Sequence, residues 1–281
     1  MLTIAAASVF DVLTLPHWFY ELTADDHSRP QRVLRRLYED PFLVGATRRL
    51  VGELTGEFGD HPGIEGWVIG DGLLSTSPPR SSEHVDEWLD GIRSVVHARG
   101  KRIWHGVSAR DMAQQRALRL GGLGQAGFGV LVHVDWKPQW AHDTRLWSSF
   151  LVSYIRGLGG LPPLVAGSAR YPFPASGDGE DAVESDIGEA HTAGAAGLIW
   201  PALLHYDSLL RSRPPFTSAP GELTRGLLGT GVRMSPAAVA WLDASANAGF
   251  VTSPSSPRLD EELRARDPEG FMRTAYGEFV S

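Results

Sequence analysis

The sequence contains no cysteine among its 281 residues. This excludes disulfide bonds, thiol nucleophiles and zinc–thiolate sites, and it leaves the compartment open. Lysine is also scarce, because only Lys101 and Lys137 occur among the 26 basic residues, so Schiff-base chemistry has two candidates. No run approaches the roughly 18 consecutive apolar residues of a membrane span, and the apolar first ten residues lack the basic start of a signal peptide. We therefore expect a cytoplasmic protein without a membrane partner.

Positive charge is in deficit as well, with a formal net charge of −7. Nucleic-acid binding needs a basic surface that neutralises phosphates, so we expect no nucleic-acid partner. The hydrophobic fraction of 42% and the charged fraction of 21% are typical of an ordinary globular protein. A chain of this length buries a substantial core, as one large α/β domain or two small ones.

Short apolar runs alternate along the chain with segments of helical period, and glycine, proline or aspartate marks the junctions. The expected strands are 2–7, 64–70, 102–108, 129–136, 163–169 and 195–200. The expected helices include 42–58, 83–99, 144–158 and 179–193. Six strands alternating with helices predict a parallel sheet with covered faces.

A doubly wound sheet and a (β/α) barrel both fit this alternation. No strand is followed by a glycine-rich phosphate-binding loop, which argues against the nucleotide-binding folds. Polar and aromatic residues instead gather where strands end, and a barrel places its active site at the carboxyl ends of its strands. We therefore predict a single TIM-type (β/α)-barrel domain over 1–281, in which 253–281 forms a C-terminal extension.

Three segments carry a resemblance to a known superfamily. They are "DPFLVGATRRLVGELTGEFGDHPGIEGWVIGDG" (40–72), "LGGLPPLVAGSAR" (158–170) and "GAAGLIWPALLHYD" (194–207). In this order and spacing they resemble the acid/base strand, the nucleophile strand and the last strand of the cellulase- and β-mannanase-like (clan A) glycoside hydrolases. The resemblance implies a glycosidase-type barrel and covers most of the chain up to about residue 247.

The chain departs from that superfamily at both catalytic positions. Gly72 stands where the resemblance implies the acid/base glutamate, and Ser168 stands where it implies the nucleophile. Retaining glycosidases need two carboxyl groups about 5 Å apart, which these residues do not supply. The run at 2–7 resembles the third strand of the superfamily, so the barrel is expected to be shortened at its N-terminus. Its open edge would then be covered by self-association or by the segment 253–281.

Two carboxylates and a histidine are the candidate catalytic residues. Asp71 replaces an asparagine of the superfamily, Asp135 replaces a tyrosine, and His133 matches a histidine. A His-x-Asp at a strand end is a plausible acid–base pair, although a packed histidine with a solvated aspartate is equally compatible. His105 has the same two interpretations. Metal ligation by these residues lacks the usual ligand spacing, so we expect neither metal nor cofactor.

The resemblance also implies a ligand cleft at the barrel mouth. Trp200 matches the tryptophan that forms the floor of the sugar site, and Trp67, inside its strand, is expected in the core. The other candidate ligand contacts are Ser168, His105, Trp136, Tyr206 and Trp18. Loop tryptophans, which include Trp140, fit a carbohydrate cleft, and they also fit the simple covering of a barrel mouth.

Three functions remain open. The first is non-hydrolytic acid–base or cyclisation chemistry on a small molecule, and the second is carbohydrate binding without catalysis. The third is ordinary β-glycosidase activity with relocated carboxylates. Fold alone does not separate them, because barrels host many chemistries.

Overall fold

The structure is a computed structural model. It describes residues 2–5, 37–71, 73–76, 78–96, 101–134, 136–143, 145–166, 179–199, 234, 239–240, 242–243, 246 and 256–281.

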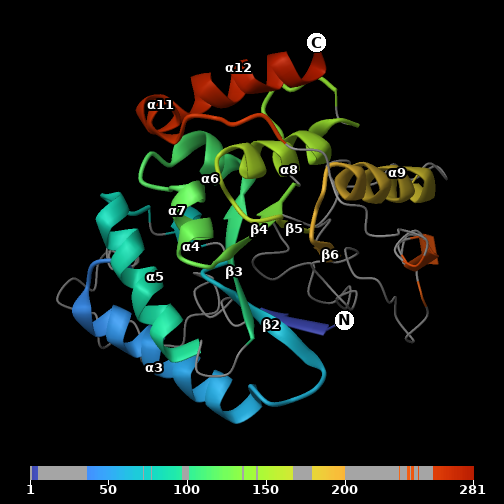
Figure 1. Ribbon diagram of the computed structural model, residues 1–281. Helices are drawn as coiled ribbons and strands as arrows, with labels where there is room; N and C mark the ends of the chain where they lie inside the picture. Colours follow the sequence, from blue (N-terminus) through green and yellow to red (C-terminus); the bar gives the residue numbers. More distant parts are fainter. Residues whose placement is uncertain are drawn as a thin grey trace, which may run out of the picture.

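Six parallel strands form one sheet in the order β1-β2-β3-β4-β5-β6, so each strand pairs with its neighbours in sequence (Figure 1). Their bounds are β1 Leu2–Ala5, β2 Ile64–Ile69, β3 Arg102–Ser108, β4 Gly129–His133, β5 Leu164–Ala166 and β6 Gly197–Ile199. This sequential parallel order is the order of a (β/α) barrel and differs from that of a doubly wound sheet, whose strand order reverses at a switch point. The predicted (β/α) barrel is confirmed, and its six recognisable strands all lie within the described residues.

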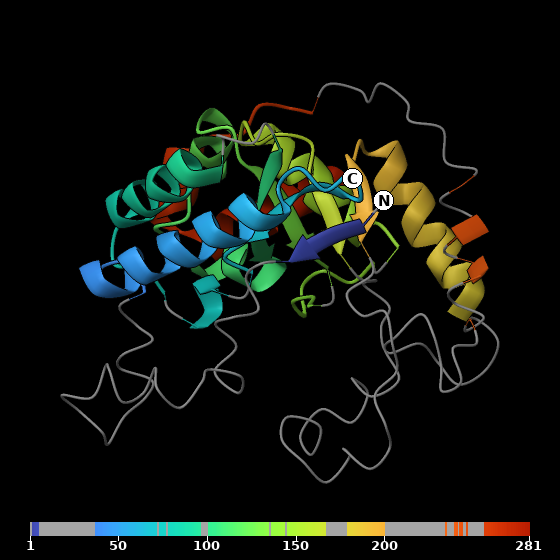
Figure 2. The ribbon, with the colours of Figure 1, turned by 90° about the horizontal axis from the view of Figure 1, so that it is seen from below.

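Helices connect the strands and lie around the outside of the sheet (Figure 2). Their bounds are α3 Pro41–Phe58, α4 Leu73–Thr76, α5 Ser82–Val96, α6 Ala109–Gln114, α7 Leu120–Gln125, α8 Trp147–Gly157, α9 Gly179–Thr192, α11 Glu261–Arg266 and α12 Pro268–Val280. The start of α3 follows from its sequence, because Pro41 stands in the first turn and the Asp40 carboxylate accepts hydrogen bonds from the Phe42 and Leu43 amides. The predicted helices at 42–58, 83–99, 144–158 and 179–193 are therefore present with small shifts at their ends.

The two faces of the sheet bury different sets of side chains. The larger core lies between the outer face and the helices, and it holds Trp67 of β2 together with Trp88 of α5. The smaller cluster consists of residues from the strands, Val68, Trp104, Leu131, Leu164 and Ala166. Since successive side chains of a strand point to opposite faces, the smaller cluster marks the inner, concave face. The expectation that Trp67 is a core residue is confirmed.

The C-terminal helices pack against the middle of the chain. Met272 and Tyr276 of α12 belong to the larger core, and the Tyr276 ring meets Phe150 of α8 edge-on, with 5.1 Å between the ring centroids. Figure 1 shows α11 and α12 beside α6 and α8, at the other end of the view from β1. The expectation that the extension 253–281 covers the first strand is therefore wrong for its described residues 256–281. Their apolar side chains meet the aromatic face of α8 instead.

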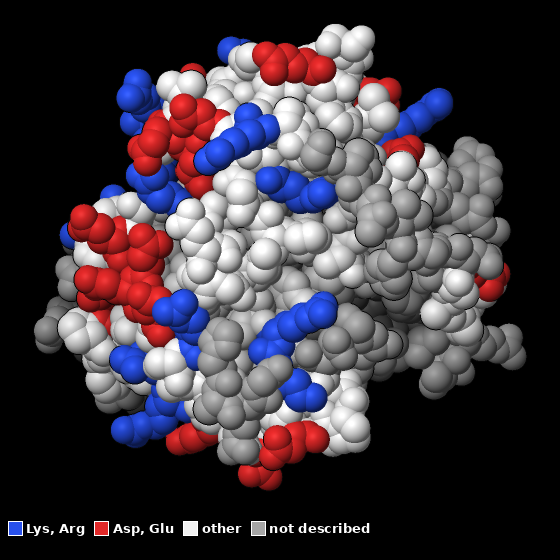
Figure 3. Space-filling model, in the orientation of Figure 1, with Lys and Arg blue, Asp and Glu red and all other residues white. Residues whose placement is uncertain are grey.

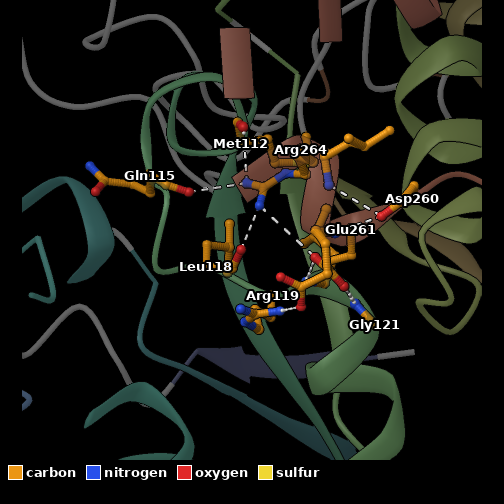
Figure 4. Close-up of polar contacts among 11 residues, drawn as sticks. Met112, Gln115, Leu118, Arg119, Gly121, Asp260, Glu261 and Arg264 are labelled. Carbon is orange, nitrogen blue, oxygen red and sulfur yellow. Dashed lines mark hydrogen bonds and ion pairs between the residues drawn. The ribbon is translucent and has the colours of Figure 1, made fainter. Parts of the chain in front are cut away.

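A buried arginine fixes this packing (Figure 4). The Arg264 guanidinium of α11 is fully buried and donates hydrogen bonds to the carbonyl oxygens of Leu118, Met112 and Gln115, at 2.5, 3.0 and 3.2 Å. Glu261 lies one turn earlier on the same helix, with its carboxylate 3.9 Å from the Arg264 guanidinium. The extension is thus joined to the loop that follows α6 by polar contacts as well as by apolar ones.

Lys and Arg are interspersed with Asp and Glu on the face of the molecule shown in Figure 3. Within the described ranges, no helix is both long enough and apolar enough to span a membrane.

Candidate active site

Asp71 and His133 meet at the carboxyl ends of two strands that are not neighbours. Asp71 follows the end of β2, and His133 is the last residue of β4. The His133 Nε2 atom lies 2.6 Å from the Asp71 Oδ1 atom, and each side chain is 22% exposed. An ionised carboxylate only accepts hydrogen bonds, so with Asp71 ionised the Nε2–H group of His133 is the donor of this hydrogen bond. The sequence predicted both residues for acid–base chemistry, and the structure brings them into direct contact.

His105 lies on β3, between these two strands, and its ring is buried against residues of the larger core. The ring is 1% exposed and packs against Trp88 of α5, with 5.8 Å between the ring centroids. The Tyr38 hydroxyl lies 3.5 Å from Nε2, and Nδ1 donates a hydrogen bond to the Gly106 carbonyl oxygen at 2.9 Å.

Burial lowers the pKa of His105 to about 4, which the hydrogen bond to Gly106 and the nearby acidic charges of Asp71 and Asp111 only partly oppose. The ring is therefore neutral at pH 7. Burial also raises the pKa of the neighbouring Tyr38 hydroxyl, and the charge of Asp111 adds to this rise. Of the two interpretations of His105, this environment favours the packed histidine.

The loop tryptophans after β4 are half-buried and pack against the larger core. The Trp136 carbonyl oxygen accepts a hydrogen bond from the Trp147 indole at 3.1 Å. The Trp140 ring lies 5.7 Å from that of Tyr276, measured between centroids. These contacts join the β4 loop to the C-terminal extension.

Five of the predicted site residues lie outside the described residues. They are Asp135, Ser168, Trp200, Tyr206 and Trp18, and Gly72 lies outside them as well. Among the residues that are described, no group of three or more His, Asp and Glu side chains is arranged to hold a metal ion.

A sizeable cavity among the described residues lies elsewhere. It has a volume of about 910 Å³ and is lined by residues of α7, α8 and the α11 region, including Arg119, Arg156 and Glu261. Arg119 is paired there with Glu262. Neither Asp71 nor His133 lines this cavity.

Two glycines beside Asp71 were not predicted as site residues. Gly70 has a φ of 74°, in the left-handed region that favours glycine, and it turns the chain between Ile69 and Asp71. Gly106 lies in β3 directly beneath Asp71. An isolated glycine inside a strand is a known sign of close backbone approach, so the run "RIWHGVS" carried a signal for Gly106.

Comparison with solved structures identifies the fold. No protein-family model matches the chain, and no curated protein matches its sequence. The structure is similar to a GH5_18 from Streptomyces cattleya in complex with GlcNAc, with 16% identity and a TM-score of 0.72 over 95% of this chain and 68% of that one. It is also similar to a GH5_18 from Bifidobacterium longum subsp. infantis, with 18% identity and a TM-score of 0.65 over 86% and 59%.

A third similar structure is the exo-β-1,4-mannosidase Op5Man5 from Opitutaceae bacterium strain TAV5, with 17% identity and a TM-score of 0.58 over 75% of this chain and 41% of that one. The chain thus spans between 41% and 68% of these three proteins. Its fold is that of the GH5-type glycoside hydrolase barrels.

Proposed function

We propose that this barrel is a repurposed relative of the glycoside hydrolases that performs non-hydrolytic acid–base chemistry on a small polar molecule at its mouth. The observation that carries this proposal is the 2.6 Å contact between Asp71 Oδ1 and His133 Nε2 at the carboxyl ends of β2 and β4. The carboxyl ends of barrel strands are where barrel enzymes place their catalytic groups.

The pair has the arrangement of an oriented general base. A carboxylate that accepts a hydrogen bond from one ring nitrogen fixes the imidazole and makes the other nitrogen more basic. Because both side chains are 22% exposed, they keep some access to solvent while the surrounding protein holds their geometry. His133 would remove or return a proton of the substrate, and Asp71 would stabilise the charge that develops on the ring.

The sequence supports chemistry other than glycoside hydrolysis. Gly72 and Ser168 occupy the positions at which the superfamily resemblance implies the two glutamates. A retaining glycosidase needs one carboxylic acid to protonate the leaving oxygen and one carboxylate to attack the anomeric carbon. Gly72 and Ser168 carry no carboxyl group. Asp135, one residue beyond Val134, would add a further acid near His133, and its position is a prediction from the sequence.

Two other functions are alternatives to this proposal. Carbohydrate binding without catalysis is favoured by the similar GH5_18 structures, which were solved with GlcNAc and with Manβ1-4GlcNAc, and by Trp200 as a stacking floor. Ordinary β-glycosidase activity would need relocated carboxylates, for which Asp71 and Asp135 are the candidates. The cytoplasmic location, the lack of a cofactor and self-association at the sheet edge stay predictions.

One experiment separates the three functions. The full chain is incubated in D₂O with mannose, GlcNAc and Manβ1-4GlcNAc, and proton NMR follows each sugar. We expect exchange or rearrangement at a carbon-bound proton of at least one sugar, without release of mannose from the disaccharide. Asp71→Asn should lower that rate by roughly 10²–10⁴, and Asp90→Asn, on the exposed face of α5, should not change it.

Two other results of this experiment would support the alternative functions. Binding of a sugar without any change in its spectrum would favour the carbohydrate-binding alternative. Release of mannose that disappears in Asp71→Asn would establish the glycosidase alternative and end the present proposal.

A further inference from the structure

The Asp71 side chain crosses over β3 to reach its partner on β4. The strand order places β3 between β2 and β4, so a carboxylate that starts from the end of β2 must pass across the β3 backbone. The crossing point is Gly106. A Cβ atom built there would lie 2.5 Å from the Asp71 Cα and 2.8 Å from its Cβ, and closer still to its Oδ1. Real Cβ atoms essentially never approach heavy atoms this closely.

Gly106 lies on the inner face of the sheet, which is the face that Trp104 shares with Leu131. His133 is two residues after Leu131 and so lies on that same face. A side chain at position 106 would therefore stand between the Asp71 carboxylate and the His133 ring. Because Gly106 has no side chain, the Asp71 carboxylate and the His133 ring can form their 2.6 Å hydrogen bond.

The β3 backbone at this point is held from the outer face. His105 donates from Nδ1 to the Gly106 carbonyl oxygen at 2.9 Å, and its ring is packed against Trp88. A Cβ atom at Gly70 would lie 2.8 Å from the His105 Cε1, so the turn before Asp71 rests directly on this ring. Asp71 and β3 therefore cannot move apart without disturbing the buried packing around His105.

We infer that Gly106 is a positioning residue for the Asp71–His133 pair, because the missing side chain at this position lets the carboxylate cross β3 and hydrogen-bond to the imidazole. The chemical importance of the pair rests on the proposed function. The steric relation between Gly106, Asp71 and His133 does not, and it can be tested without a substrate.

The first test observes the hydrogen bond itself. Proton NMR of the full chain, with ¹⁵N-labelled histidine, should show a downfield imidazole N–H resonance that is lost in Asp71→Ala, which has no acceptor, and in His133→Gln. Gly106→Ala should also lose it. Gly197→Ala is the matched control, since it places the same methyl group in β6 of the same sheet, where among the described residues it meets the tip of the Leu164 side chain at 3.0 Å and no other atom within 4 Å. This control should keep the resonance.

A folded Gly106→Ala protein that keeps the resonance would overturn the inference. A merely structural role for Gly106 would lower the melting temperature and leave the resonance in place, so the two roles are distinguished. Loss of the resonance together with an absence of sugar chemistry in the wild-type chain would refute the proposed function and leave the positioning role standing.

A second measurement covers the case in which Gly106→Ala folds poorly. Asp71→Gly removes the side-chain atoms that the new methyl group would meet, although the backbone of residue 71 stays close to it. We expect Gly106→Ala to lower the melting temperature less in the Asp71→Gly background than in the wild-type chain, because the contacts with Oδ1 and Cβ are removed while the contact with the Cα of residue 71 remains. An equal loss in both backgrounds, or a double variant that folds no better than Gly106→Ala, would show that Asp71 is not the group that requires glycine at position 106.

Discussion

Replacement of Arg264 by methionine tests whether the C-terminal extension is held by buried polar contacts. The Arg264 guanidinium is fully buried, and three backbone carbonyl groups accept its hydrogen bonds (Figure 4). Methionine fills much of the same volume and offers no donor. The carbonyls of Leu118, Met112 and Gln115 then lose this donor inside the protein, and Glu261 loses its ion-pair partner at 3.9 Å.

The expected cost follows from these contacts. Removal of one member of a buried ion pair typically costs about 3–5 kcal/mol, and a buried polar group left without a partner costs about 1–3 kcal/mol. Glu261 keeps two other partners, the amides of Leu120 and Gly121, each at 2.6 Å, which limits the loss. We expect a decrease of about 4 kcal/mol in the free energy of unfolding. At roughly 2–4 °C for each kcal/mol, the melting temperature should fall by on the order of 10 °C.

Thermal and urea unfolding, followed by circular dichroism, measure this change. Arg266→Met is the matched control, because Arg266 lies on the same short helix with an exposed side chain. We expect it to change the free energy of unfolding by less than about 0.5 kcal/mol. If Arg264→Met costs less than about 1 kcal/mol, water or a rearranged loop satisfies the three carbonyls, and the extension is held mainly by its apolar side chains.

Two further predictions concern titration and the barrel mouth. Burial lowers the pKa of His105 to about 4, whereas an unfolded histidine titrates near 6.5. The unfolded chain therefore takes up the proton first, and stability present above pH 6.5 should be lost as the pH falls toward 4. The pKa difference corresponds to about 3 kcal/mol, and His105→Gln should remove this part of the pH dependence in urea unfolding. Trp200→Ala should abolish sugar binding if the mouth only binds, whereas Asp71→Asn should spare binding and slow turnover if it catalyses. A ligand whose binding and turnover are unchanged in both Asp71→Asn and Asp135→Asn would contradict a catalytic role for these residues.

The sequence was sufficient to predict the elements and the fold class. Period-two and period-3.6 patterns are local properties, so the strands at 64–69 and 102–108 and the helices at 41–58 and 82–96 were predicted to within a few residues. The placement of Asp71 and His133 at one end of the sheet also followed, because parallel strands direct their carboxyl ends to the same edge. The superfamily resemblance indicated a barrel, which periodicity alone does not distinguish from a doubly wound sheet.

Only the tertiary structure decided which of these residues touch. The sequence left the packed and the functional interpretation open for both His105 and His133, and the structure buries His105 against Trp88 while it joins His133 to Asp71. Which face of a strand is covered by a helix depends on packing between distant segments, and a one-residue change of register reverses it. Burial in the C-terminal extension also depends on packing between distant segments. Its charged sequence resembles a polar linker, yet Arg264 is buried, because its donors match three carbonyl groups that lie about 150 positions earlier in the chain.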